Sequence, residues 1–258
     1  GKQFVYDAWN RLVTVKNSGG TTLKTYSYDG QNRRVTETAS GTTTDLFYSA
    51  NWQVLAEKVG SNTTKRYVWS PVYVDAMVLR DRDTNADGTL DERLWVQQDA
   101  NFNVTALVNG SGVVVERYVY DAYGVATIYD AGYTVRANSA YSWTYLFQGR
   151  NIDSTSGLHH FRNREYSATL GRFFNLDPIR YSAGDVNLYR AMGNNTVRYI
   201  DPEGTDFGDW WKRNRMDNRV HGLGRAIGGG GSCTVGSRSE RLQARRSWAD
   251  WPEPESWR

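Results

Sequence analysis

The chain has 258 residues, of which 39% are hydrophobic, and a formal net charge of +3 at pH 7, so it is long enough for one or two domains with a sizeable core. A single cysteine excludes an internal disulfide and a cysteine-based zinc site, and three histidines are too few for a dedicated metal cluster. No apolar run approaches the roughly 20 residues that a membrane-spanning helix needs. With 17 Tyr and 10 Trp but only 3 Met, the composition favours strands over a helical bundle.

A hairpin-like unit recurs along the first half of the chain. Residues 4–15 (FVYDAWNRLVTV) return at 26–37 (YSYDGQNRRVTE), with further copies at 46–57, 96–107 and 118–129. Alternating apolar positions predict strands, and segments rich in Gly and Asn predict the turns between them. The aspartate of each Tyr-Asp pair is expected to accept backbone N–H groups in a turn. Such hairpins bury a face only against their neighbours, so the sequence predicts an all-β array of stacked hairpins.

An acidic insertion, residues 79–95 (LRDRDTNADGTLDERLW), interrupts the repeat. Asp83, Asn85, Asp87 and Asp91 have the alternating spacing with which a calcium loop begins, because oxygen ligands at every second residue point into one concavity. Leu94 stands where an EF-hand requires a bidentate Glu, which excludes an EF-hand. The segment is therefore either a short loop with weak affinity for calcium or an ordinary exposed turn.

Two Asp-Pro pairs follow in the last third of the chain, at Asp177 and Asp201. Two carboxylates held together can split a peptide bond, because one stays protonated as the acid while the other activates water. The same aspartates would also suit the corners of a β-structure, where Pro fixes the preceding residue and Asp accepts backbone N–H groups. His159 and His160 are expected to pack within a strand, because no third metal ligand or nucleophile is placed beside them.

The units YDAWNRL and YDGQNRR resemble the YD repeat of RHS proteins. The segments FRNREYSATLGRFFNLDP and NLYRAMGNNTVRYIDPEG resemble the RHS repeat-associated core domain, and the likeness covers residues 4–204. It implies a β-ribbon that spirals into a hollow shell in a much larger parent protein and is closed by the core. In that family the shell encloses a variable C-terminal polypeptide, often a toxin, and the core releases it by autoproteolysis.

Applied to this sequence, the resemblance implicates Asp177 and Asp201 as the catalytic pair of an aspartyl autoprotease, with Arg172 of GRFF as their charge partner. The cut is implied between Gly204 and Thr205, and no cofactor is required. The sequence departs from the family pattern at two positions. Arg180 stands where the first motif usually has Gly, and Thr205 stands where the family commonly has a larger apolar residue.

The sequence thus predicts three parts. Residues 1–145 form the YD-repeat ribbon, 146–204 the core, and 205–258 a variable tail rich in Arg and Trp. The tail holds 10 Lys and Arg against 7 Asp and Glu, and a Gly-rich linker divides it into two pieces too short for a core. We therefore expect the tail to be poorly ordered, and nucleic-acid binding is not favoured because acidic residues dilute its charge.

Two functional classes remain open from the sequence. One is a self-processing scaffold that releases its tail, and the other is a structural or adhesive surface protein in which the same core only plugs the shell. An effector enzyme in the tail has the least support, because no catalytic constellation is present there. The expected partners are the enclosed tail, upstream repeats of the parent protein, and a cell surface or target cell. The expected location is secreted or at the cell surface, with an export signal upstream of this fragment.

Overall fold

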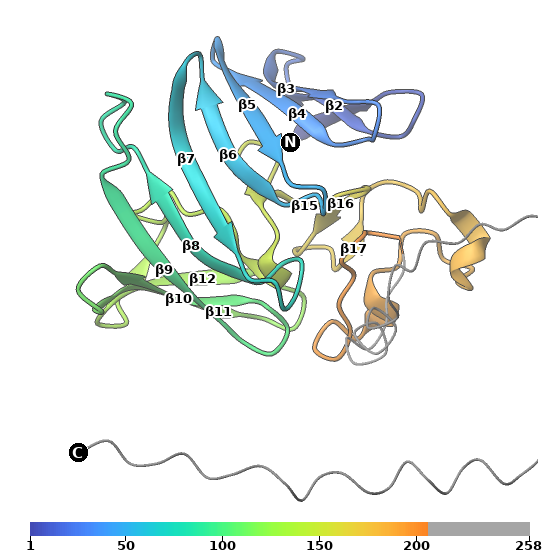
Figure 1. The fold of residues 1–258 in the computed structure, drawn as a ribbon. Helices are drawn as coiled ribbons and strands as arrows, with labels where there is room; N and C mark the ends of the chain where they lie inside the picture. The colour runs from blue at the N-terminus through green and yellow to red at the C-terminus, as the bar shows by residue number, and fades with distance from the viewer. Residues whose placement is uncertain (206–258) are drawn as a thin grey trace, which may run out of the picture. The chain divides into compact units, whose positions relative to one another are not determined.

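The computed structural model describes residues 1–205, and it confirms the prediction of an all-β fold (Figure 1). Thirteen strands form one antiparallel sheet in sequence order, and four short strands form a second sheet. The predicted tail lies outside the described residues from position 206 onward. Within residues 1–205, no helix is long and apolar enough to cross a membrane.

The elements have the following bounds. The first sheet consists of β1 (Lys2–Tyr6), β2 (Leu12–Asn17), β3 (Thr22–Tyr28), β4 (Arg34–Ala39), β5 (Thr42–Tyr48), β6 (Val54–Val59), β7 (Asn62–Trp69), β8 (Met77–Arg82), β9 (Glu92–Gln98), β10 (Val104–Asn109), β11 (Val114–Tyr120), β12 (Ala126–Asp130) and β13 (Val135–Arg136). The second sheet consists of β14 (Ile152–Asp153), β15 (Leu158–Phe161), β16 (Arg164–Ser167) and β17 (Arg172–Phe173). Three short 3-10 helices are η1 (Phe147–Gly149), η2 (Arg180–Ala183) and η3 (Met192–Asn194).

The aspartates of the Tyr-Asp pairs close turns, as predicted. Asp7 Oδ1 accepts the backbone N–H of Trp9 at 2.9 Å and that of Arg11 at 3.0 Å. The same pair of bonds, to the second and fourth residues after the aspartate, recurs at Asp29, Asp99 and Asp121. Each carboxylate thus accepts two backbone N–H groups that the strands leave unpaired, and this fixes the turn at one end of the hairpin.

The aromatic residue before each turn links neighbouring hairpins. The side chains of Tyr28, Tyr48, Trp69 and Tyr120 each donate a hydrogen bond of 2.7 Å to the backbone carbonyl that opens an earlier strand, at Leu12, Arg34, Val54 and Val104 respectively. The strand register shifts just before Tyr6, Tyr28, Tyr48 and Trp69. Bulges of this kind bend a strand and increase its twist. Because they recur at the same end of successive hairpins, they curve the whole sheet.

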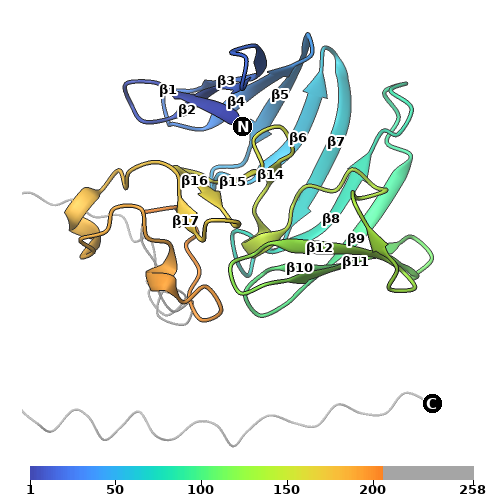
Figure 2. The same ribbon diagram turned by 180° about the vertical axis from the view of Figure 1, so that it is seen from behind.

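The second sheet lies against the inner face of this curved ribbon, with β2–β4 on one side of it and β10–β12 on the other in both ribbon views (Figures 1 and 2). Lys24 Nζ lies 2.6 Å from Asp153 Oδ2, and the Tyr26 hydroxyl donates to the same oxygen at 2.8 Å. At the other end, Arg80 donates to the carbonyl of Tyr141 at 2.9 Å. Polar contacts therefore join the inner face to residues 139–205 at both of these places.

Apolar packing forms three clusters. The largest joins Tyr67, Leu94 and Leu107 of the ribbon to Trp143 and Tyr145. A second lies within the second sheet and its connections, and includes Phe147, Phe161, Tyr166, Phe173, Ala191 and Met192. The third lies between the first hairpins, at Leu12, Val15 and Tyr26. Met192 is buried and Tyr199 packs against the second cluster.

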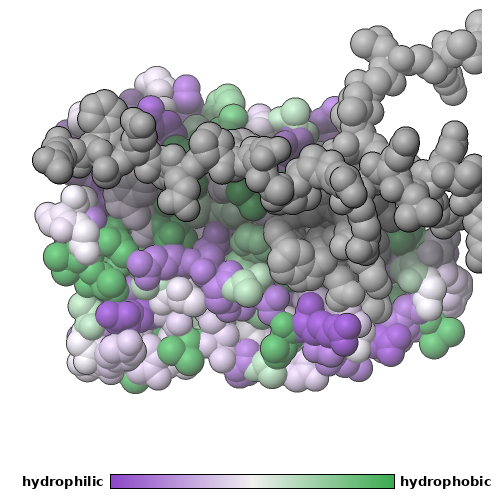
Figure 3. All heavy atoms as spheres, turned by 60° about the horizontal axis from the view of Figure 1, so that its bottom comes forward, coloured by the Kyte–Doolittle hydropathy of each residue, from purple (hydrophilic) through white to green (hydrophobic). Residues whose placement is uncertain are grey.

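The outer face of the ribbon carries scattered apolar side chains. Val68, Trp95 and Val119 are each about half exposed, and charged residues such as Arg66 and Arg93 lie on neighbouring positions, paired with Asp81. Hydrophobic and hydrophilic residues are interspersed over the face drawn in Figure 3. Single apolar side chains among polar ones are ordinary on a solvated face of a sheet.

His159 should make the fold sensitive to acid. It is buried in β15 beside Phe147 and Tyr166, as predicted for strand packing, and burial lowers the pKa of its imidazole to about 4. The unfolded chain takes up this proton near pH 6.5, so the stability is present above that pH and is lost as the pH falls toward 4. The loss amounts to about 3 kcal/mol. Denaturant unfolding of the wild type and of His159→Phe between these pH values should show that the variant loses less; equal losses would contradict the assignment.

Candidate functional site

The two Asp-Pro aspartates meet at one guanidinium group. Arg164 Nη1 lies 3.0 Å from Asp177 Oδ2, and Arg164 Nη2 lies 3.2 Å from Asp201 Oδ2. All three residues are at most 5% exposed. One positive charge between two negative charges offsets much of the repulsion that would otherwise keep two buried carboxylates apart. The structure thus brings both predicted aspartates to one buried site.

The peptide bond between Gly204 and Thr205 lies at the same site. Arg164 Nε donates to the Gly204 carbonyl oxygen, on the side of the guanidinium next to Nη2. Asp201 Oδ1 accepts the backbone N–H of Gly204 at 2.8 Å and that of Thr205 at 3.2 Å. Arg164 therefore contacts the carbonyl oxygen of this bond, and Asp201 contacts its nitrogen.

Only glycine fits the position before the bond. Gly204 has φ +67°, and a Cβ added there would lie 2.1 Å from the carbonyl oxygen of Phe161 in β15. A backbone of this conformation and a contact this close both favour glycine. The chain thus passes directly over the β15–β16 hairpin, which brings the carbonyl of Gly204 within reach of Arg164 at the start of β16.

A small cavity of about 10 Å³ opens beside the two carboxylates. Asp177, Asp201, Thr205 and Arg164 line it, together with Arg180 of η2. A space of this size is at the lower limit for one water molecule, and its walls are polar. The site therefore has room for about one water beside the Gly204–Thr205 bond.

Arg172 does not have the predicted role of charge partner. Its side chain lies over the ring of Tyr189, 4.5 Å from the centroid, and Nε donates to the carbonyl of Phe173. Arg172 and Phe173 form the short strand β17, so their side chains point to opposite faces of the sheet. Arg164, which stacks over the ring of Phe173 at 3.6 Å on the buried side, pairs with the aspartates instead.

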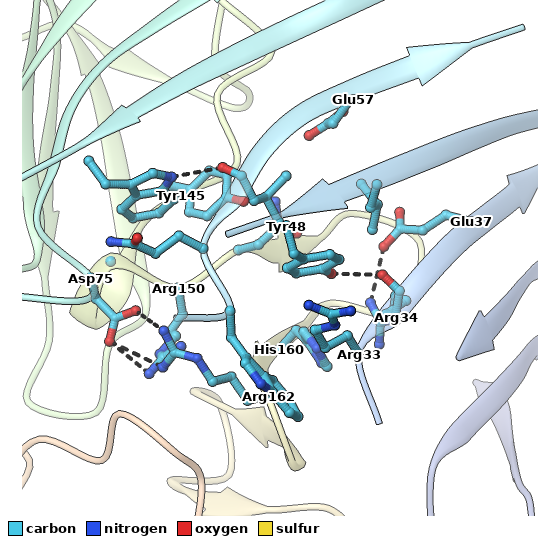
Figure 4. Close-up of a pocket in the computed structure, with 17 residues that line it drawn as sticks. Arg33, Arg34, Glu37, Tyr48, Glu57, Asp75, Tyr145, Arg150, His160 and Arg162 are labelled. Atoms are coloured by element: carbon cyan, nitrogen blue, oxygen red, sulfur yellow. Dashed lines mark hydrogen bonds and ion pairs between the residues drawn. The ribbon is translucent and has the colours of Figure 1, made fainter. Parts of the chain in front are cut away.

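A second buried ionic cluster holds the chain just before this bond. Asp75, in the turn between β7 and β8, lies 2.8 Å from Arg150 Nη2 and 2.8 Å from Arg162 Nη2. Both arginines also donate to the carbonyl oxygen of Pro202. Figure 4 shows the two guanidinium groups converging on Asp75 at the edge of a cavity of about 70 Å³ between the ribbon and residues 145–162. A turn of the ribbon thus fixes the second Asp-Pro segment.

A third cluster connects β4 to β16. Arg34 Nη2 lies 2.7 Å from Glu165 Oε1, and His160 Nδ1 lies 2.9 Å from the same oxygen. Burial alone would raise the pKa of Glu165, but the charge of Arg34 and the contact with His160 outweigh it and hold that pKa below its usual value. Since Glu165 follows Arg164 in β16, this cluster fixes the strand that carries the central arginine.

Sequence reasoning missed Arg164, Arg150, Arg162 and Asp75. A weak signal was available: three arginines occur within residues 150–164, close to the apolar residues Leu158 and Phe161 that favour a buried strand. Arginines that become buried in such a segment need carboxylates or carbonyl groups as partners. Nothing in the sequence indicates that Asp75 or the aspartates of the Asp-Pro pairs are those partners.

The acidic insertion is a tight turn in the structure. Asp83 accepts the backbone N–H groups of Ala86 and Gly88 at 2.7 Å, one on each carboxylate oxygen. Asp91 accepts bonds from the backbone N–H and the hydroxyl of Thr84, while Asn85 and Asp87 bond to each other. Among residues 1–205, no three His, Cys, Asp or Glu side chains converge as metal ligands would. The turn role accounts for these contacts, and calcium binding stays a prediction.

The fold and site together define a class: a ribbon of Tyr-Asp hairpins curved around a small sheet that buries an Asp–Arg–Asp cluster. The model of the family described as RHS Repeat matches residues 6–50. The chain is 31% identical over 116 residues to the tRNA nuclease WapA of Bacillus subtilis, and 30% identical over 125 residues to the toxin subunit YenC2 of Yersinia entomophaga. The chain therefore contains RHS-repeat sequence at residues 6–50, and it is similar to these RHS-type relatives over somewhat less than half of its length.

These alignments cover 44% and 48% of this chain, but only 5% of WapA and 12% of YenC2. A third relative, salivary gland surface protein 1 of Aedes aegypti, is 36% identical over 100 residues, which are 39% of this chain and 3% of that protein. The chain thus spans a small part of the relatives that it matches.

The solved structures most similar in fold include the crystal structure of TcdB2-TccC3, which matches 79% of this chain and 10% of its own with a TM-score of 0.60 and 20% identity. The structure of TcdB2-TccC3 without its hypervariable C-terminal region matches the same shares with a TM-score of 0.59 and 22% identity. This likeness establishes the fold.

Proposed function

We propose that the chain is the C-terminal part of a secreted or cell-surface RHS scaffold that encloses its own variable tail and releases it by cutting itself between Gly204 and Thr205. The observation that carries this proposal is the position of Arg164. Its guanidinium contacts Asp177, Asp201 and the carbonyl oxygen of Gly204. Two buried carboxylates and a polarised carbonyl are the groups that aspartyl peptide hydrolysis requires.

In this proposal each group has a role. Asp177 acts as the base: it takes a proton from water as the water oxygen adds to the carbonyl carbon of Gly204. Arg164 stabilises the negative charge that develops on the carbonyl oxygen. Asp201, which accepts the N–H of Thr205 in the resting chain, takes up a proton from solvent before the reaction. It gives this proton to the nitrogen of Thr205, 3.2 Å from its Oδ1, as the C–N bond breaks. The products are the carboxyl group of Gly204 and the free amino group of Thr205.

The enclosing role rests on the curved ribbon and on the relatives. The second sheet contacts the inner face of the ribbon through Arg34 and Glu165, and the ribbon turn at Asp75 is linked through Arg150 to the backbone just before the bond proposed for cleavage. WapA is named as a nuclease and YenC2 as a toxin subunit, and one similar structure is described as TcdB2-TccC3 without its hypervariable C-terminal region. A released C-terminal effector, with a target cell as the final partner, agrees with those names.

The alternative function is a structural or adhesive surface protein whose core only plugs the shell. The observation that favours it is the completeness of the ionic contacts, because a guanidinium bound to two carboxylates is also a stable way to tie two segments together. The two functions differ in one outcome. A scaffold that processes itself yields two polypeptides split at Gly204, whereas a plug stays in one piece with every contact of Arg164 retained.

The test of the proposal is the fate of the chain with the upstream repeats of its parent protein present. We expect the purified protein, tagged at both ends, to separate under denaturing conditions into two polypeptides whose masses place the cut after Gly204. In native size-exclusion chromatography the two are expected to elute together, because the tail stays enclosed. A single intact chain would instead support the plug.

The calcium loop is proposed only as a weak site. If it binds at millimolar calcium, the melting temperature should rise with added calcium, and equal magnesium should not reproduce the rise. The variant Asp87→Asn, which removes an exposed carboxylate without removing the contacts of Asp83, should lose the effect. Equal responses of wild type and variant would leave residues 83–91 as a turn.

A further inference from the structure

The turns of the first two Tyr-Asp units contact the core next to the segments that carry Asp177 and Gly204. In the first unit, Asn10 Nδ2 donates to the carbonyl of Leu176 at 2.9 Å, and the carbonyl of Asn10 accepts from Asn175 Nδ2 at 2.9 Å. These two bonds hold the backbone immediately before Asp177. Their partners are 165 and 166 residues apart in sequence, so the contact exists only when the first hairpin packs against the core.

The second unit makes the equivalent contact at the other aspartate. Asn32 Nδ2 donates to Asn163 Oδ1 at 3.0 Å, and Asn163 Nδ2 donates to the carbonyl of Glu203 at 2.9 Å. Glu203 directly precedes Gly204, and Asn163 directly precedes Arg164. One relay of two amides thus connects the ribbon to the segment that carries the bond and to the arginine that contacts it.

The two asparagines occupy the same position of the repeat, and the turn does not need their amides. Both have positive φ, 64° for Asn10 and 69° for Asn32, and the turn is closed by the preceding aspartates. In the third and fourth units the same position, also with positive φ, is Trp52 and Phe102. A side-chain amide is therefore not required for the turn, and its contacts with the core remain as the distinctive feature of the first two units.

We propose that Asn10 and Asn32 are positioning residues for the self-cleavage, and that they make the cut conditional on the first two hairpins being wound onto the core. This inference rests on the proposed function. Asn10 fixes the backbone that leads to Asp177. Asn32 acts through Asn163, which contacts Glu203 and directly precedes β16. A chain whose ribbon has not closed lacks both contacts, so its tail is not cut before it is enclosed.

The test compares cleavage rates of full-length chains made by cell-free synthesis and followed by intact mass. Asn10→Gly and Asn32→Gly keep the positive φ and remove the amides; each is expected to slow cleavage about tenfold or more, because small displacements of reacting groups carry large losses of rate. Asn51→Gly, the same change at an exposed turn residue of the third unit, should leave the rate unchanged. If Asn32 acts through Asn163, the pair Asn32→Gly and Asn163→Ala should be no slower than Asn163→Ala alone.

Val15→Ala distinguishes a loss of stability from a loss of positioning. It weakens the packing between the same hairpins but leaves the amides of Asn10 and Asn32 in place. Melting temperatures are compared in the uncleavable Asp201→Asn background. If Val15→Ala slows cleavage as much as Asn10→Gly at an equal fall in melting temperature, the positioning role is wrong. If the Asn10→Gly and Asn32→Gly chains are cut as fast as the Asn51→Gly chain, the positioning inference is wrong but the proposed function stands. An uncut wild type would overturn the proposed function and the inference with it.

Discussion

Replacing Asp201 with asparagine is expected to reduce cleavage between Gly204 and Thr205 by about 10²–10⁴-fold, which on the time scale of expression means loss of the cut. Asparagine has nearly the same shape, and its Oδ1 can still accept the N–H groups of Gly204 and Thr205. It cannot deliver a proton to the leaving nitrogen. Intact mass of the purified chain measures the effect, and Asp177→Asn should have the same result because water then lacks its base.

The matched control is Asp121→Asn. Asp121 closes a Tyr-Asp turn through Oδ1, a contact that asparagine retains, and it lies outside the Arg164 cluster. The control chain should be cut like the wild type. Far-ultraviolet circular dichroism should be the same for all variants. If Asp201→Asn chains are cut at the same bond and at the same rate as the control, the assignment of an aspartyl pair fails.

Asp75→Ala is expected to lower the free energy of unfolding by about 3–5 kcal/mol, because it leaves the buried guanidinium groups of Arg150 and Arg162 without their carboxylate. Removal of one partner of a buried ionic cluster is much more costly than loss of an exposed pair. Urea unfolding followed by circular dichroism measures the change. The Asp201→Asn background keeps every chain uncut during the measurement.

Asp45→Ala, on the half-buried strand β5, serves as the control and should change the stability much less. A loss below about 1 kcal/mol for Asp75→Ala would mean that Arg150 and Arg162 do not depend on this carboxylate. Because both arginines also hold the carbonyl of Pro202, the same variant should slow cleavage in chains that keep Asp201.

The ribbon was predictable from the sequence because its determinants are local. The aspartate of each Tyr-Asp pair, such as Asp7, closes a turn with the residues two and four positions later. The alternation of apolar residues determines which face of each strand is buried. The curvature was not predictable in the same way. It depends on bulges before Tyr28 and Tyr48 and on hydrogen bonds from the hydroxyls of these residues to strands about 15 residues earlier. No local sequence pattern predicts these contacts.

The site was predictable only in part. The two aspartates come from the likeness to a family, whereas the choice between Arg172 and Arg164 depends on which face of the second sheet each occupies. These strands have only two to four residues, too few for alternation to reveal the buried face. The contacts of Asp75, Asn10 and Asn32 join residues that are 75 to 166 positions apart, so they follow from the closed ribbon rather than from any segment alone.

The most direct test of the account is the position of the cut. Asp-Pro bonds also break chemically in acid, so cleavage at Asp177-Pro178 or Asp201-Pro202 would have no bearing on the site. The measurement is N-terminal sequencing and intact mass of the released tail, purified at neutral pH from wild type and from Asp201→Asn. The account predicts a tail that begins at Thr205 in the wild type and no tail in the variant. A tail that begins at Thr205 in both, or an intact chain in both, would contradict it.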